Sequence, residues 1–243
     1  MRCDTSTTNG SGATGWRSSD SGTDDRLRRL SVRASEQHAT EDASDHPSYL
    51  FRTCGHPVSS ENEVTMRVIG GEFRSRKLKT PAGDSVRPTP DRLREALFNI
   101  LSPRIVDSVF LDAYAGSGSV GIEALSRGAK RSIFIEKSRA ALRALQENIA
   151  ALGIKERCEV CPDSASTVIT RFAADIVFLD PPYPREIEYV RCLEALGGQP
   201  RPLIVVQHTS KFTSQLKEQY GALRRVRLVS QGDNSMSFYE PRE

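Results

Sequence analysis

Short apolar runs alternate with helical periods from Val109 onward, and this alternation constrains the fold more than any other feature of the chain. The spans with i, i+3, i+4 apolar spacing predict helices over 119–127, 138–152 and 185–196. The apolar runs at 109–111, 133–135, 176–179 and 203–206 predict strands that are buried on both faces, as in a parallel sheet. Residues 157–161 are predicted to form a further strand. The alternation therefore predicts an α/β fold with helices on both faces of a mostly parallel sheet. Ligands of such folds bind at the carboxyl ends of the strands.

Composition divides the chain near Met66. Residues 1–65 hold 19 Ser or Thr, no Lys, and 7 Arg against 10 acidic residues, whereas residues 66–243 hold 27 basic against 21 acidic residues. Long stretches of the first part have no apolar period. The segment Thr5–Ser21 is nearly pure Ser, Thr, Gly and Asp and cannot bury enough surface to offset the entropy of ordering. We therefore predict one domain over 66–243. Residues 1–65 are predicted to be a disordered extension, or a product of a start site upstream of Met66.

The turn after the first predicted strand reads Asp112-Ala113-Tyr114-Ala115-Gly116-Ser117-Gly118-Ser119-Val120-Gly121, which contains a G-x-G-x-x-G pattern. Glu136 lies 20 residues after Gly116, where an acid can bind ribose hydroxyls. Asp112 would be electrostatically unfavourable beside a pyrophosphate, because the two negative charges repel each other. It suits a ligand with an ammonium group and a sulfonium centre, such as S-adenosylmethionine. We expect both carboxylates to have polar partners only when the ligand is bound.

A second motif, Asp180-Pro181-Pro182-Tyr183, directly follows the fourth predicted strand. The two prolines stiffen the loop and remove two backbone donors. The Asp side chain and a proline carbonyl are acceptors that suit the N–H donors of an exocyclic amine, and Tyr183 offers a flat face for a base. The motif indicates catalysis by positioning and charge complementarity.

These residues resemble motifs of class I methyltransferases that act on base amino groups. The segments 67–78, 87–99 and 232–239 make residues 66–243 similar to the RsmD family. The resemblance implies a Rossmann-like fold with a seven-stranded, mostly parallel sheet. It also implies methylation of the guanine N2 amine at position 966 of bacterial 16S ribosomal RNA, with S-adenosylmethionine as cofactor. Naked RNA and the assembling small subunit both remain open as substrate.

The resemblance also implies roles for individual residues. Asp112, Tyr114, Gly116 and Gly118 would contact the methionine side of the cofactor, Glu136 its ribose, and Asp163 with Ser164 its adenine, while Asp180, Pro181, Pro182 and Tyr183 would hold the guanine. The chain departs from the family after the fifth predicted strand. Gln207-His208 stands where many relatives have a carboxylate, and we interpret His208 as a residue of the strand end.

The segment 66–101 is basic and is predicted to form a hairpin followed by a helix. Thr89 and Pro90 would start this helix, and Leu93, Leu97 and Leu101 would form its buried stripe. The basic side chains predict a phosphate-contacting surface, against the alternative of an ordinary solvated face. The predicted RNA contacts are Arg67, Arg74, Arg76, Lys77, Arg87 and Arg92.

Two other classes of protein share part of these motifs. A DNA adenine-N6 or cytosine-N4 methyltransferase would use a similar loop, but no span of 66–243 is left over for a DNA-recognition region. A nicotinamide-dependent oxidoreductase would leave Asp112 and the Pro-Pro-Tyr loop unexplained.

Cys158 and Cys161 have no second pair and are interpreted as structural thiols, so no metal is expected. No apolar run reaches the roughly 18 to 20 residues of a membrane span, and we expect a cytoplasmic monomer without a membrane partner.

Overall fold

The computed structural model describes residues 66–81, 91–182, 185–198 and 202–242, and these residues belong to one compact unit that spans Ser59–Glu243. The helices are α1 (Asp91–Ile105), α2 (Ser119–Ser126), α3 (Arg139–Leu152), α4 (Ala165–Val168) and α5 (Glu186–Leu196). The longer strands are β3 (Val109–Asp112), β4 (Arg131–Ile135), β5 (Cys158–Cys161), β6 (Ile176–Leu179), β7 (Leu203–Thr209), β9 (Leu223–Gln231) and β10 (Asn234–Pro241). The short strands are β1 (Met66–Arg67), β2 (Lys77–Leu78) and β8 (Gln219–Tyr220). The disorder predicted for 1–65 concerns residues outside those described.

Within the described residues the large sheet has the strand order β5-β4-β3-β6-β7-β10-β9-β8. Strands β5, β4, β3, β6 and β7 are paired in parallel, and β10, β9 and β8 add antiparallel pairs at one edge. The predicted α/β fold and mostly parallel sheet are confirmed. The two-residue strand β8 adds an eighth strand to the seven that we expected. The order reverses between β3 and β6, which is the position where ligands bind in open α/β sheets.

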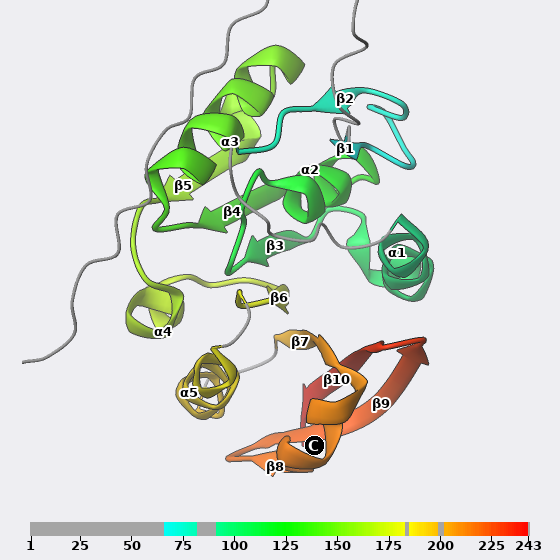
Figure 1. Ribbon diagram of the computed structural model, residues 1–243, viewed down its shortest axis with the longest axis vertical. Helices are drawn as coiled ribbons and strands as arrows, with labels where there is room; N and C mark the ends of the chain where they lie inside the picture. Colours follow the sequence, from blue (N-terminus) through cyan, green and yellow to red (C-terminus); the bar gives the residue numbers. More distant parts are fainter. Residues whose placement is uncertain (1–65, 82–90, 183–184, 199–201, 243) are drawn as a thin grey trace, which may run out of the picture. The chain divides into compact units, whose positions relative to one another are not determined.

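Helices cover both faces of this sheet (Figure 1). On one face α1, α2 and α3 pack on alternate strand residues such as Phe110, Phe134 and Phe178. On the other face α4 and α5 pack on residues such as Leu111 and Val177. Burial on both faces explains why β3, β4, β6 and β7 are largely continuous apolar runs rather than alternating ones. The edge strand β5 is only half-buried.

Local sequence explains where the best-defined helix begins and ends. The Ser138 hydroxyl accepts a hydrogen bond from the Ala141 N–H at the start of α3, and Gly153 ends this helix in the left-handed conformation with φ of 68°. In α1 the predicted stripe of Leu93, Leu97 and Leu101 is buried. The predicted start of α1 at Thr89 and Pro90 lies outside the described residues.

The segment before α1 forms the predicted hairpin. Strands β1 and β2 pair antiparallel, with Met66 opposite Leu78 and Arg67 opposite Lys77. We call residues 66–79 the hairpin arm. Its apolar residues Met66, Val68, Phe73 and Leu78 belong to the core on the α1–α3 face. The arm is therefore an integral part of the described domain, although its charged side chains are exposed.

Candidate active site at the carboxyl edge of the sheet

Three carboxylates gather at the carboxyl edge of the sheet. Asp112 ends β3, Asp180 follows β6, and Glu136 follows β4. Both β4 and β6 pair directly with β3, and the charges of Asp180 and Glu136 both act on Asp112. The order reversal between β3 and β6 thus brings two separate sequence motifs, the glycine turn and the Asp-Pro-Pro-Tyr loop, to one place.

The Asp112 side chain is buried and is held by the backbone that follows it. Its Oδ2 accepts a hydrogen bond from the Gly121 N–H at 3.0 Å, and the Tyr114 N–H also donates to the carboxylate. Burial, together with the negative charges of Asp180 and Glu136, outweighs these hydrogen bonds and raises the pKa of Asp112 to about 7. The expectation that Asp112 has a polar partner only with ligand bound is therefore wrong.

The same expectation is wrong for Glu136. Its Oε2 accepts from the Gly116 N–H at 2.8 Å and its Oε1 accepts from the Ser138 N–H at 2.7 Å. A carboxylate at a strand end can always be satisfied by the N–H groups of the turn beside it, and sequence spacing gives no sign of this. Both acids are thus held in place by the backbone before any ligand is considered.

The turn between β3 and α2, which we call the glycine loop (residues 113–118), has one open side. Gly116 has φ of 54°, and a Cβ added to it would meet nothing within 4 Å. By contrast, a Cβ on Gly118 (φ of 84°) would lie 2.4 Å from Leu145 Cδ1, and one on Gly121 would lie 2.3 Å from Phe134 Cε1. Gly118 and Gly121 are therefore required by packing, whereas Gly116, whose N–H bonds Glu136, leaves open space.

The loop after β6 is described in part. Asp180 is half-buried, Pro181 is buried and Pro182 is exposed. The Pro182 carbonyl accepts a hydrogen bond from the Arg185 N–H at 3.1 Å, which turns the chain toward α5. Tyr183, the residue predicted to stack on the base, lies outside the described residues.

Other predicted cofactor residues differ in their surroundings. The Tyr114 hydroxyl lies 3.1 Å from Glu188 Oε2 and 3.3 Å from Cys192 Sγ, so it points to α5. Burial raises the pKa of this hydroxyl. Asp163 is exposed after β5, and its Oδ1 accepts from the Ser164 N–H at 2.7 Å. Asp163 and Ser164 therefore begin α4 at the edge beyond Glu136.

Most of the predicted RNA contacts are exposed on the hairpin arm or at the start of α1. Arg67, Arg74, Arg76 and Lys77 of the arm and Arg92 of α1 all have exposed side chains. Arg67 pairs with Asp91 at 3.8 Å, and Arg76 Nη2 donates to the Ala151 carbonyl at 3.1 Å. The remaining predicted contact, Arg87, lies outside the described residues.

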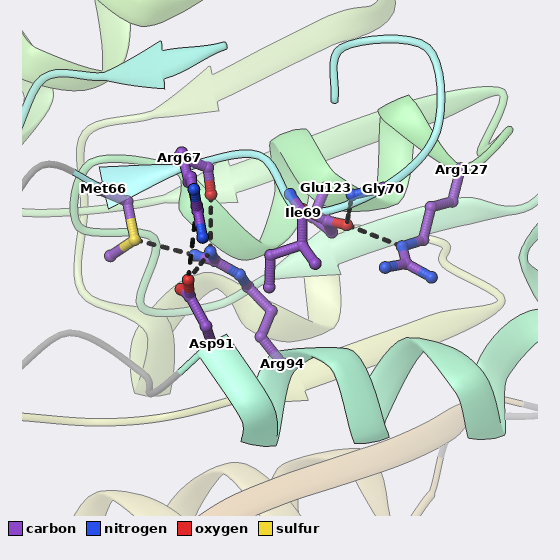
Figure 2. A network of polar contacts seen from close by, with 8 residues as sticks. All are labelled: Met66, Arg67, Ile69, Gly70, Asp91, Arg94, Glu123 and Arg127. Atoms are coloured by element: carbon purple, nitrogen blue, oxygen red, sulfur yellow. Dashed lines mark hydrogen bonds and ion pairs between the residues drawn. The ribbon is translucent and has the colours of Figure 1, made fainter. Parts of the chain in front are cut away.

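A buried ionic network that sequence reasoning missed fixes the hairpin arm on α1 and α2 (Figure 2). Glu123 is fully buried, and its carboxylate accepts from the Ile69 N–H at 2.7 Å, from the Gly70 N–H at 2.8 Å and from Arg127 Nε at 2.7 Å. Arg94 is fully buried too, and its Nη2 donates to the Arg67 carbonyl at 2.7 Å and to Asp91 at 3.0 Å. Charged residues inside helical periods were the only signal that could have revealed this network.

The predicted strand-end role of His208 agrees with its position in β7. His208 is buried, with Nε2 2.9 Å from Ser237 Oγ and Nδ1 2.8 Å from the Thr209 carbonyl, and burial lowers its pKa. Gln207 is also buried.

Within the described ranges Cys158, Cys161 and Cys192 form no disulfide, and no group of three or more His, Cys, Asp or Glu is arranged to hold a metal ion. No helix in the same ranges is long and apolar enough to cross a membrane.

Comparison with known proteins finds relatives that are named as rRNA methyltransferases. The family model described as "conserved hypothetical protein 95" matches residues 66–240. The chain is 43% identical over 135 residues to ribosomal RNA small subunit methyltransferase D of Escherichia coli K12, covering 54% of this chain and 68% of that protein. It is 33% identical over 192 residues to a Bacillus subtilis protein assigned as an rRNA methyltransferase, covering 73% of this chain and all of that protein.

Solved structures show the same fold. An Escherichia coli protein assigned as a methyltransferase superposes with a TM-score of 0.64 at 34% identity, covering 73% of this chain and 98% of that one. A 16S rRNA N2 G1207 methyltransferase from Thermus thermophilus, in complex with AdoMet and guanosine, superposes with a TM-score of 0.56 at 20% identity over 73% of this chain and 50% of that one. At that identity the second likeness concerns the fold alone.

Proposed function

Because the chain belongs to the RsmD family of S-adenosylmethionine-dependent methyltransferases, we propose that it methylates the exocyclic N2 amine of a guanine in 16S ribosomal RNA. The family resemblance points to guanine 966. The observation that carries this proposal is the meeting of Asp112 and Asp180 at the point where the strand order reverses between β3 and β6. One motif there suits a cationic cofactor and the other suits an amine, and methyl transfer requires the two to be adjacent.

The residues at this edge fit S-adenosylmethionine. Its sulfonium group, when bound, supplies an electrophilic methyl group. The carboxylates of Asp112, Glu136 and Asp180 provide the negative potential that a sulfonium and an ammonium group require. Gly116 leaves room for close approach because no atom lies within 4 Å of its missing Cβ. Glu136 is fixed by two N–H groups, and its carboxylate is proposed to accept hydrogen bonds from the ribose hydroxyls as well. We propose Tyr114 and Gly118 as supports of this pocket, with Asp163 and Ser164 beside the adenine.

Asp180 and the carbonyl of Pro181 are proposed to accept the two N–H groups of the guanine amine. Both acceptors draw the protons into the loop plane, so the nitrogen lone pair is directed toward the methyl group. The nitrogen can lose its proton after attack, so no general base with a raised pKa is needed. Pro182 stiffens the loop, and Tyr183 is proposed to stack on the base. The guanine must be unpaired or leave its helical stack to reach the loop.

The hairpin arm and the start of α1 are proposed to bind the RNA backbone through Arg67, Arg74, Arg76, Lys77, Arg87 and Arg92. The basic side chains of this set that the structure describes are all exposed, which supports the proposal. We further propose that residues 66–243 form the methyltransferase domain. It would act in the cytoplasm as a monomer on the rRNA of a small subunit.

The proposal is tested with radiolabelled S-adenosylmethionine and small ribosomal subunits from a strain that lacks the enzyme. Transfer of one methyl group to a guanine N2, mapped by mass spectrometry of 16S rRNA fragments, is the expected result. Naked 16S rRNA and double-stranded DNA are assayed in parallel. Transfer to adenine or cytosine in the DNA arm, with none to rRNA, would overturn the proposal in favour of a DNA amino methyltransferase.

A further inference from the structure

Asn148 on α3 uses its side-chain amide to bind two segments that are far apart in sequence. It is 2% exposed. Its Oδ1 accepts from the Lys79 N–H at 2.8 Å, and its Nδ2 donates to the Lys79 carbonyl and to the Ser117 carbonyl, both at 3.0 Å. The amide can take only this orientation, because the Lys79 N–H can only donate and the two carbonyls can only accept.

The two segments that meet at Asn148 have different proposed partners. Lys79 is the last residue of the hairpin arm, which carries the proposed phosphate contacts. Ser117 is 8% exposed and lies in the glycine loop, between Gly116 with its open side and Gly118. Because all three hydrogen bonds go to backbone atoms, a movement of either segment changes the hydrogen bonds available to the other.

Besides Arg94 on α1, further anchors of the hairpin arm lie at the carboxyl-terminal end of α2. Ser126 Oγ accepts from the Phe73 N–H at 2.9 Å and donates to the Gly70 carbonyl at 2.5 Å. A Cβ on Gly71 would lie 1.8 Å from the Ser126 carbonyl oxygen, so the arm sits directly on this turn of α2. These bonds fix the arm, but they join it to the carboxyl-terminal end of α2 rather than to the glycine loop at its start.

We propose that Asn148 is a positioning residue that couples the RNA-binding arm to the cofactor loop. The inference rests on the proposed function. When S-adenosylmethionine orders the glycine loop, the Ser117 carbonyl holds the Asn148 amide, and the amide holds the backbone of Lys79. Bound cofactor therefore strengthens RNA binding to the arm. By thermodynamic reciprocity, bound RNA strengthens cofactor binding by the same factor. Asn148 itself touches neither substrate.

The experiment is hydrogen–deuterium exchange of the full chain with and without saturating S-adenosylmethionine. In the wild type, the cofactor is expected to slow exchange both in residues 113–121 and in the hairpin arm. The decisive variant is Asn148→Asp, which keeps the size of the side chain but places an oxygen against the carbonyls of Lys79 and Ser117. In this variant, the cofactor is expected to protect residues 113–121 only.

Ser126→Ala is the matched control, because it loosens the arm without touching the glycine loop. It is expected to raise the exchange rate of the arm but to keep the cofactor-dependent slowing. Cofactor affinity and the KM for RNA are expected to separate the two variants in the same way. Asn148→Asp is expected to remove the enhancement of cofactor affinity by RNA, a factor of about 5 or more for a typical coupling, whereas Ser126→Ala raises only the KM for RNA.

The outcomes separate the inference from the proposed function. A wild-type protein that does not bind S-adenosylmethionine would overturn the proposed function. If bound cofactor left the hydrogen–deuterium exchange rate of the wild-type hairpin arm unchanged, the proposed coupling would be overturned, whether or not the variants fold. Full cofactor-dependent protection of the arm in Asn148→Asp would reduce Asn148 to a packing residue.

Discussion

At the carboxyl edge of the sheet, backbone N–H groups hold the acidic side chains of Asp112 and Glu136. In the hairpin arm the arrangement is inverted. There Glu123 and Asn148 hold the backbone of the arm from inside the core, and the arm's basic side chains remain exposed. Substitutions in the two regions are therefore expected to act differently. At the edge a single residue holds the fold and is proposed to bind the ligand, whereas in the arm the buried anchors hold the fold and the exposed side chains are proposed to bind the substrate.

The largest expected effect on stability comes from an anchor of the arm. Glu123→Ala leaves two backbone N–H groups, Arg127 and the nearby buried Arg94 without their shared anion. Loss of one partner of a buried ion pair costs about 3–5 kcal/mol, and urea denaturation measures this. Glu95→Ala, at an exposed position of α1, is the control and should stay within about 0.5 kcal/mol. Equal stabilities of the two variants would show that the network does not hold the arm.

The edge acids are expected to affect both cofactor binding and stability. Asp112→Ala and Glu136→Ala should each weaken S-adenosylmethionine by about ten- to a hundredfold, which corresponds to one lost charge-assisted hydrogen bond. Both should also lower the melting temperature, because each leaves a backbone N–H group of the glycine turn without its acceptor. Calorimetry and thermal denaturation measure the two effects. Unchanged affinity in both variants would reject the cofactor assignment.

The raised pKa of Asp112 predicts a pH dependence. Below about pH 7 the buried carboxyl group is protonated in the folded protein. A cationic cofactor favours the carboxylate, so binding releases a proton and affinity should rise with pH, by up to about tenfold per unit, and level off above pH 7. The unfolded pKa is near 3.8, so Asp112 also makes stability fall as pH rises from about 4 to 7. Calorimetry across this range checks the first effect, and retention of the slope in Asp112→Ala would contradict it.

The smallest effect is expected from exposed side chains of the arm. Neutralising Arg74 and Lys77 should lower the slope of log RNA affinity against log salt by about 1.4 to 1.8, since each phosphate contact contributes about 0.7 to 0.9. Cofactor affinity and stability should not change. Arg76→Gln is a useful comparison, because Arg76 also bonds the Ala151 carbonyl and should cost some stability as well. A slope unchanged by the double substitution would make this surface an ordinary solvated face.

The sequence predicted the elements that local patterns encode. The inner parallel strands β3, β4, β6 and β7 are runs of mainly apolar residues because both faces are covered. The two site motifs follow strands that the topology makes adjacent. The sequence did not reveal the buried network, because Glu123 meets Ile69 and Gly70 across more than fifty residues. Nor did it reveal that Gly121 and Gly116 donate to the two edge acids. Such partners depend on how a turn folds back, which spacing alone does not specify.

We propose that the loop after β6 holds the amine that receives the methyl group. Single-turnover transfer to small ribosomal subunits by Asp180→Ala, with cofactor affinity measured in the same preparation, tests this role. We predict that transfer falls by on the order of 100-fold or more, while S-adenosylmethionine still binds within a few fold of wild type. Tyr183→Phe should be mild and Tyr183→Ala severe, since only the second removes the stacking face. Transfer by Asp180→Ala at close to the wild-type rate would contradict the account.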